Sequence, residues 1–337
     1  MDDERRRPTL KEVAALSGVS TISASRVMSG GPNISDELRA KVEQAARTLG
    51  YQRNRIAGSL RGQATDLIAV IVPSMSNNVF PNFVDGLDQS LRETALRPVL
   101  GMTNYCDATE ESVLRDMLSW NPAGIILAGL EHTQGTRDLL ARYDGPIVEV
   151  MDVDGQAIDF AVGTSQIEAG KLIARHFIAR GYRKIGYIGA WGERPVRSLK
   201  RRLAFEAELF ALGHPIIASR ICDEASSMEG GAREMEQLLT QHRDLDAVFF
   251  ANDDLALGAL FYCKNAGISV PGDVAIAGFN GLEMCQQISP RLTTIQTPRK
   301  EMGHLAGSLI RQHNREIASE TAKIHKLPLG LIQGETT

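Results

Sequence analysis

From Leu67 onward, short apolar runs alternate with longer stretches whose apolar residues recur at helical spacing. The apolar runs have the length of buried strands, and they are LIAVIVP, RPVLGMT, AGIILAG, PIVEVMD, KIGYIGA, DAVFFAND and DVAIAGFN. Helices are expected at about residues 78–96, 109–119, 165–180, 200–212, 230–242, 253–266 and 299–315. Such alternation predicts an α/β fold with helices on both faces of a parallel sheet, and it repeats about twice. We therefore expect two lobes with a cleft at the carboxyl ends of their strands, where open α/β sheets bind ligands.

The first fifty residues follow a different pattern, that of three short helices. Thr9 and Glu12 have the spacing of a capping box, which predicts the start of a helix. Gly18 permits a sharp reversal, and Ser20 is a good N-cap for a second short helix. Two short helices joined by a tight glycine turn form a helix-turn-helix unit. A third helix is expected after Ser35.

The charge of the chain is unevenly distributed. Eleven Lys or Arg residues stand against four Asp or Glu residues between Arg5 and Thr65, a net of +7 in a chain whose formal charge is −4. A small basic head on a larger acidic body indicates that the head alone meets a polyanion. Pattern and charge together favour DNA binding, with a helical domain for protein contacts as the alternative.

The sequence lacks the motifs that are typical of several other classes of protein. The four cysteines are scattered and the seven histidines form no H-E-x-x-H pattern, so we expect neither disulfides nor a metal site. GYIGAWG follows a strand but lacks the G-x-G-x-x-G spacing, and no nucleophile elbow or P-loop occurs. We expect no enzyme activity and no cofactor. Because the chain has no long apolar run and no secretory signal, we expect a cytoplasmic protein without membrane contact.

The segment PTLKEVAALSGVSTISASRVMSGGPNISDELRAKVEQAARTLGYQRNRIAGSLRG resembles the headpiece of the lactose-repressor (LacI) family of bacterial transcription regulators. The resemblance rests on T-L-K-E-V-A, G-V-S, S-R-V and L-G-Y-x-x-N-R, and it continues to the C-terminus. It implies an all-α helix-turn-helix headpiece at residues 1–52, a hinge helix and linker at 53–66, and a periplasmic-binding-protein-like body at 67–337. We place the lobes of the body at about 67–163 with 282–297, and 164–281 with 298–337. The implied partners are a palindromic double-stranded DNA operator, a small effector and a second copy in a homodimer.

Base recognition is expected at the exposed start of the second helix, and the resemblance implies a leucine wedge in the minor groove at Leu60. The DNA-binding residues that we predict are Thr9, Ser20, Thr21, Ile22, Ser23, Arg26, Asn33, Asn54, Arg55, Ala57, Leu60 and Arg61. For residues 54–60, an ordinary flexible linker is the alternative to a hinge helix.

Strand ends and family positions nominate the residues that face the effector. They are Ser74, Phe80, Asp152, Arg194, Arg197, Arg201, Asn252 and Asn280. Asp253 belongs either to this set or to the cap of the following helix. For some of the arginines in RPVRSLKRR a position on the surface is the alternative, since a cleft needs only one or two.

Two observations suggest a sugar acid as the effector. Asn280 stands where family members often carry aspartate, so the pocket has one negative charge fewer beside its arginines. Independently, segments such as PSMSNNVFPNFVDGLD and MLSWNPAGIILAG resemble the gluconate-operon repressor branch of the family. A DNA-binding repressor of sugar-acid catabolic genes is the resulting hypothesis. The alternative is a sugar-acid binding protein or degenerate enzyme whose head contacts protein.

Overall fold

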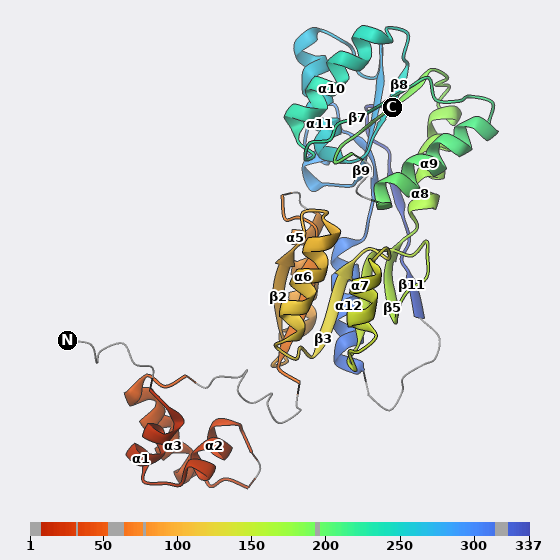
Figure 1. The fold of residues 1–337 in the computed structure, drawn as a ribbon. Coiled ribbons are helices and arrows are strands. Elements are labelled where there is room, and N and C mark those ends of the chain that lie inside the picture. Colours follow the sequence, from red (N-terminus) through yellow and green to blue (C-terminus); the bar gives the residue numbers. More distant parts are fainter. Residues whose placement is uncertain (1–7, 32, 53–63, 77–78, 193–195, 314–322) are drawn as a thin grey trace. The chain divides into compact units, whose positions relative to one another are not determined.

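The computed structural model describes residues 8–31, 33–52, 64–76, 79–192, 196–313 and 323–337. The chain folds into two compact units, Met1–Thr65 and Asp66–Thr337 (Figure 1). No helix among the described residues is long and apolar enough to cross a membrane.

The small unit contains three helices, α1 (Leu10–Ser17), α2 (Thr21–Met28) and α3 (Asp36–Leu49). Thr9 and Glu12 form the capping box that their spacing predicts, with the Thr9 backbone N–H donating to Glu12 Oε2 at 2.6 Å. Gly18 ends α1 with φ 68°, a left-handed conformation that glycine adopts at little cost. The helices meet at small buried side chains, among them Ala24 and Val42. This arrangement is a helix-turn-helix unit with a supporting third helix.

The large unit contains two lobes, each built on one sheet of six described strands. In the first sheet the spatial order is β11 (Lys323–Lys326), β5 (Phe160–Thr164), β4 (Ile147–Asp152), β3 (Gly124–Ala128), β1 (Leu67–Val72) and β2 (Arg97–Met102). In the second it is β12 (Gly330–Ile332), β10 (Thr293–Gln296), β9 (Ala275–Asn280), β8 (Ala247–Phe250), β6 (Ile185–Gly189) and β7 (Ala218–Ile221). The pairings are parallel except that β12 runs antiparallel to β10.

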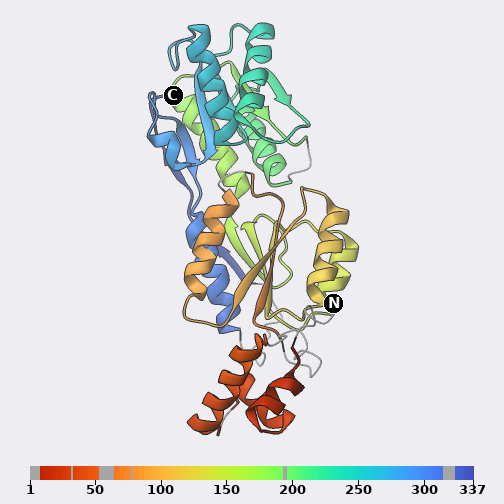
Figure 2. The same cartoon turned by 90° about the vertical axis from the view of Figure 1, so that its left-hand side faces the viewer.

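Helices cover both faces of each sheet. In the first lobe, α5 (Val79–Leu91) and α12 (Arg299–Gln312) pack on one face, and α6 (Asp107–Leu118) and α7 (Gln134–Leu140) on the other (Figure 2). The helices of the second lobe form two pairs, α8 (Gln166–Ala179) with α9 (Val196–Ala211), and α10 (Met228–Gln241) with α11 (Asp253–Ala266). A 3₁₀ turn, Glu283–Gln286, precedes β10.

The structure corrects the expected assignment of the C-terminal segments to the lobes. Residues 282–297 belong to the second lobe, because β10 pairs with β9 and β12. Residues 299–312 and 323–326 belong to the first lobe, where α12 packs on α5 and β11 pairs with β5. Two glycines allow this close packing: a Cβ on Gly86 would lie 2.1 Å from the Lys300 carbonyl oxygen, and one on Gly303 would lie 2.0 Å from the Phe83 carbonyl oxygen.

A charged cluster lies buried in the first lobe. His132 Nδ1 is 2.8 Å from Glu110 Oε1, and its Nε2 is 3.2 Å from Glu149 Oε1. The side chains of His132 and Glu149 are fully buried. Burial lowers the pKa of His132, but the two carboxylates outweigh burial and raise that pKa to about 9. The imidazole is therefore a cation at neutral pH.

Candidate functional site

The first half of α2 presents an exposed face on the small unit. Thr21 and Ile22 begin the helix and are exposed, and Ile22 is 76% exposed. Ala24 and Val27 point the other way and are buried in the core of the unit. Ser20 caps the helix and accepts a hydrogen bond of 3.1 Å from the Ser23 backbone N–H. The cap therefore fixes the start of the helix, and an isoleucine with no partner in the core stands on its outer face.

The other DNA-binding residues that we predict in the small unit differ in how exposed they are. Arg26 is exposed on α2, and Asn33 is exposed with φ 60°, a conformation that asparagine tolerates. Thr9 is half-buried, and its side chain is engaged in the capping box. The remaining predicted DNA contacts lie outside the described residues, and they are Asn54, Arg55, Ala57, Leu60 and Arg61.

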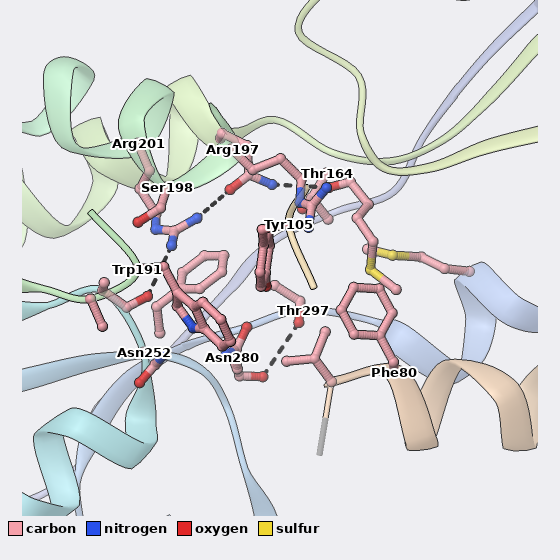
Figure 3. Close-up of a pocket in the computed structure, with 17 residues that line it drawn as sticks. Phe80, Tyr105, Thr164, Trp191, Arg197, Ser198, Arg201, Asn252, Asn280 and Thr297 are labelled. Atoms are coloured by element: carbon pink, nitrogen blue, oxygen red, sulfur yellow. Dashed lines mark hydrogen bonds between the residues drawn. The ribbon is translucent and has the colours of Figure 1, made fainter. Parts of the chain in front are cut away.

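A cavity lies between the two lobes of the large unit (Figure 3). It contains about 730 Å³ of space free of protein atoms, part of which is open to solvent. This volume is in the range of small-molecule binding sites. Five of the predicted effector residues line it, namely Phe80, Arg197, Arg201, Asn252 and Asn280. Of the remaining three, Ser74 and Asp152 do not line it, and Arg194 lies outside the described residues.

Arg201 is the most deeply buried cation of the cavity. Its guanidinium donates to Gln166 Oε1 and, over 2.9 Å, to the Ala251 carbonyl oxygen, and it lies 3.6 Å from the centre of the Phe279 ring. Its Nε is buried without a hydrogen-bond partner among the described residues. Burial lowers the pKa of Arg201 to about 10, so the side chain stays charged at neutral pH.

Arg197 lies one turn earlier on α9 and crosses to the first lobe. Its Nη1 donates to the Ala128 carbonyl oxygen at 3.1 Å. Gly129 makes room for it, since a Cβ there would lie 3.0 Å from Nη1, and φ is 110° at this position. Among the described residues that line the cavity are these two arginines, together with amides, hydroxyls and aromatic rings, and none of them is a carboxylate.

The two asparagines are fixed by different contacts. Asn252 caps α11 by accepting a hydrogen bond of 3.1 Å from the Leu255 backbone N–H, and it also bonds to the Ser226 hydroxyl. Asn280 ends β9 with φ 118°, and its carbonyl oxygen accepts from the Arg299 guanidinium. For Asp253 the sequence left two roles open, a contact in the cleft or the cap of the following helix, and the structure gives it neither. It is fully buried and accepts hydrogen bonds from Leu282 N and Thr294 Oγ1.

Asp152 belongs to an ion-pair cluster that joins the lobes beside the cavity. Lys200 of α9 extends from the second lobe and places its Nζ 2.7 Å from Asp152 Oδ2 and 2.5 Å from Glu131 Oε1, both in the first lobe. It also donates to the Asp154 carbonyl oxygen at 2.8 Å. The Asp152 carboxylate is therefore neutralised by protein. Ser74 is buried and donates to Ser76 Oγ at 3.0 Å.

Two aromatic residues that the sequence reasoning did not nominate also line the cavity. Tyr105 follows β2 in the first lobe and Trp191 follows β6 in the second, and their ring centroids are 4.7 Å apart. Both have left-handed backbone conformations, with φ 56° and 68°. Their position directly beyond strand ends was the available indication, because ligands of α/β sheets bind there.

The described residues contain no group of three His, Cys, Asp or Glu side chains placed to hold a metal ion. The residues that line the cavity offer hydrogen-bonding groups, aromatic surface and positive charge.

Comparison with known proteins assigns both units. Residues 9–54 match the family model described as bacterial regulatory proteins, lacI family, and residues 174–337 match a periplasmic binding protein-like domain. The chain is 38% identical over 305 residues to the HTH-type transcriptional regulator GntR of Pseudomonas aeruginosa, covering 89% of this chain and 87% of the relative. It is 34% identical over 302 residues to the regulator of the same name from Escherichia coli, covering 90% of each.

A solved structure of a protein similar to this chain also belongs to a transcriptional regulator. The crystal structure of a LacI-family transcriptional regulator from Silicibacter pomeroyi is 38% identical, with a TM-score of 0.92 over 98% of this chain and 99% of that one. These proteins are transcriptional regulators rather than enzymes. The chain belongs to the LacI family, and it is a DNA-binding transcriptional regulator with a helix-turn-helix headpiece and a two-lobed body.

Proposed function

We propose that this regulator is a homodimeric repressor of sugar-acid catabolic genes. A sugar acid of the gluconate or ketogluconate type, bound between the lobes, controls its affinity for a palindromic operator. The observation that carries the proposal is the charge of the cavity, whose described lining holds Arg197 and Arg201 and no carboxylate.

The energetics of Arg201 favour an anionic ligand. Its charge is buried and its Nε has no hydrogen-bond partner among the described residues. No carboxylate among the described lining residues offsets this charge, so a ligand carboxylate placed against the guanidinium supplies the missing counter-charge. A charge-assisted hydrogen bond of this kind contributes about 1.5–3 kcal/mol. The polyol part of the ligand then finds the amides of Asn252 and Asn280 and the ring of Phe80 in the same cavity.

On the DNA side, we propose that the exposed face of α2 reads the bases. Ile22 has no hydrogen-bonding group, so it contacts a thymine methyl group or packs on a sugar. Thr21 and Ser23 supply hydroxyls beside it, and the hinge residues, led by Leu60, contact the minor groove.

A ligand screen followed by a DNA-binding assay tests the proposal. Thermal unfolding is measured with gluconate, ketogluconates, uronates and the matching neutral sugars, because a ligand at a hundred times its Kd stabilises the folded state by about 2.7 kcal/mol. Fluorescence anisotropy then follows binding to a palindromic duplex that the protein has selected from a random pool. We expect an acid to stabilise the protein more than its neutral counterpart and to change its operator affinity. Equal stabilisation by glucose and gluconate would refute the acidic ligand, and an unchanged operator affinity would refute the control mechanism.

A further inference from the structure

A second cavity adjoins the first. It contains about 550 Å³ of space, part of it open to solvent, and lies at the carboxyl ends of β1, β2 and β3 in the first lobe. Two residues, Tyr105 and Arg197, line both cavities. They therefore stand between the two spaces.

The position of Tyr105 is fixed from both lobes. The Trp191 ring of the second lobe packs against its ring at an interplanar angle of 51°. Burial raises the pKa of the Tyr105 phenol, whereas the positive charge of Arg197 nearby lowers it. The residue as a whole is half-buried. Arg197 is held in turn by the Ala128 carbonyl oxygen.

The backbone at Tyr105 also indicates a constrained position. Left-handed φ values are uncommon for bulky residues and persist where the surrounding structure imposes them. Asn104 and Tyr105 both have such values, 52° and 56°, and Trp191 has one of 68° on the other side of the contact. Two strained segments from different lobes thus bring the rings together.

The two cavities differ in charge. The first is lined by two arginines and no described carboxylate, whereas the second is lined by Arg197 together with Asp107, Glu110 and Glu131. Glu110 is paired with His132 and Glu131 with Lys200, so these carboxylates bring acceptor oxygens but little net negative charge. A ligand that extended from the first cavity into the second would meet hydrogen-bond acceptors there. A neutral sugar, with its many hydroxyl donors, suits that surface, and a second negative charge does not.

We infer that Tyr105 is a specificity-determining residue, whose ring closes the first cavity and limits the ligand to a single sugar-acid unit. The inference rests on the proposed function and adds a size limit to it. With the ring removed, the joined cavities accommodate an aldobionate, which is a sugar acid with one neutral sugar attached.

The test compares Tyr105→Gly with Tyr105→Phe. Glycine removes the ring and suits the left-handed backbone, while phenylalanine keeps the ring and is the matched control. Isothermal titration calorimetry gives the affinities for gluconate and cellobionate, and for the neutral pair glucose and cellobiose. The ratio within each pair is the measured quantity, because general damage to the protein lowers both affinities and leaves the ratio unchanged.

We expect the wild type and Tyr105→Phe to prefer gluconate strongly over cellobionate. Tyr105→Gly should reduce this preference by at least about tenfold, since specificity is a difference between two binding free energies. Wild-type operator affinity in all three proteins shows that the fold is intact. An unchanged ratio in Tyr105→Gly overturns the size limit while leaving the proposed function in place. If the wild type binds glucose as well as gluconate, the acidic ligand is wrong, and a change of the glucose-to-cellobiose ratio in Tyr105→Gly still supports the size limit. A wild type that binds none of the four ligands, and no ketogluconate or uronate in the thermal screen, overturns both.

Discussion

Replacing Lys200 by methionine removes a charge that joins the two lobes and keeps most of the length of the side chain. The Lys200 ammonium touches two carboxylates of the first lobe, those of Asp152 and Glu131. Although burial lowers the pKa of Lys200, these carboxylates raise it above its ordinary value, so the charge is present at neutral pH. The variant leaves the fully buried Asp152 carboxylate without its cation.

The cost follows from the burial of each partner. Removing one partner of a buried ion pair costs about 3–5 kcal/mol, whereas exposed pairs contribute about 0–1 kcal/mol. The Lys200 side chain is 19% exposed, Glu131 is 38% exposed, and Asp152 keeps a hydrogen bond from the Asp154 backbone N–H. We therefore expect about 2 kcal/mol, or roughly 30-fold in the equilibrium between joined and separated lobes.

Small-angle scattering and calorimetry measure the two consequences. The radius of gyration of the ligand-free variant should increase, and its affinity for the sugar acid that best stabilises the wild type should fall by up to about 30-fold. Lys184→Met is the matched control, because Lys184 pairs with Asp244 at 3.0 Å where both side chains are more than half exposed.

A double-mutant cycle decides whether the ion pair is the cause. Asp152→Asn removes the other charge, so the double variant with Lys200→Met has no unpaired buried charge and should recover part of the lost affinity. Additive losses, or a Lys200→Met variant that matches Lys184→Met, would refute the role of Lys200 in joining the lobes.

Three further predictions concern other parts of the molecule. Ile22→Ala should change which operator is preferred in a selection from random DNA, and equal weakening on all sequences would contradict base reading by this residue. Arg201→Ala should bind operator normally but give no response to sugar acid in the anisotropy assay, and a full response would remove Arg201 from the site. In the folded protein the pKa of His132 is about 9, above its ordinary value of 6.5. Its ion pairs with Glu110 and Glu149 therefore stabilise the fold fully below pH 6.5. This stabilisation is lost as the pH rises through 9. In urea unfolding, the advantage of wild type over His132→Gln should shrink by about 3 kcal/mol between these limits, and a constant difference would argue against the raised pKa.

The sequence predicted the elements of the core better than their assignment to lobes. Buried strands such as β1 and β8 form continuous apolar runs, so their pattern is unambiguous. The sequence did not predict the edge strands β7, β11 and β12, which are short and partly exposed. It also missed two internal strands, β5 and β10, although most of their residues are buried, because they are short and contain glycine or threonine. Periodicity also cannot show which sheet a helix covers. The place of α12 in the first lobe depends on the close contacts at Gly86 and Gly303, which only the folded chain brings together.

For the cavity, residue chemistry was a better guide than residue position. Arg197 and Arg201, which lie on α9, were predicted because a polar ligand needs such groups, and Arg201 also has a family position. The amides of Asn252 and Asn280 were predicted because they follow strands. Asp152 has the same location, but its carboxylate is paired with Lys200, a partner 48 residues away whose contact the sequence does not indicate. Tyr105 was missed because its contact with Trp191 forms between separate lobes, and the sequence does not indicate such a contact.

The first turns of α9 connect ligand binding to the arrangement of the lobes. Arg201 faces its own lobe and the cavity, Arg197 reaches the Ala128 carbonyl oxygen of the first lobe, and Lys200 reaches Asp152. A ligand that contacts the two arginines therefore acts on the same helical turn that carries the inter-lobe ion pair. A ligand changes DNA affinity only if it binds two arrangements of the protein unequally. Because Arg197 is both part of the cavity and part of the contact between lobes, a ligand that engages it has unequal affinity for joined and separated lobes, which is the condition that control of DNA binding requires.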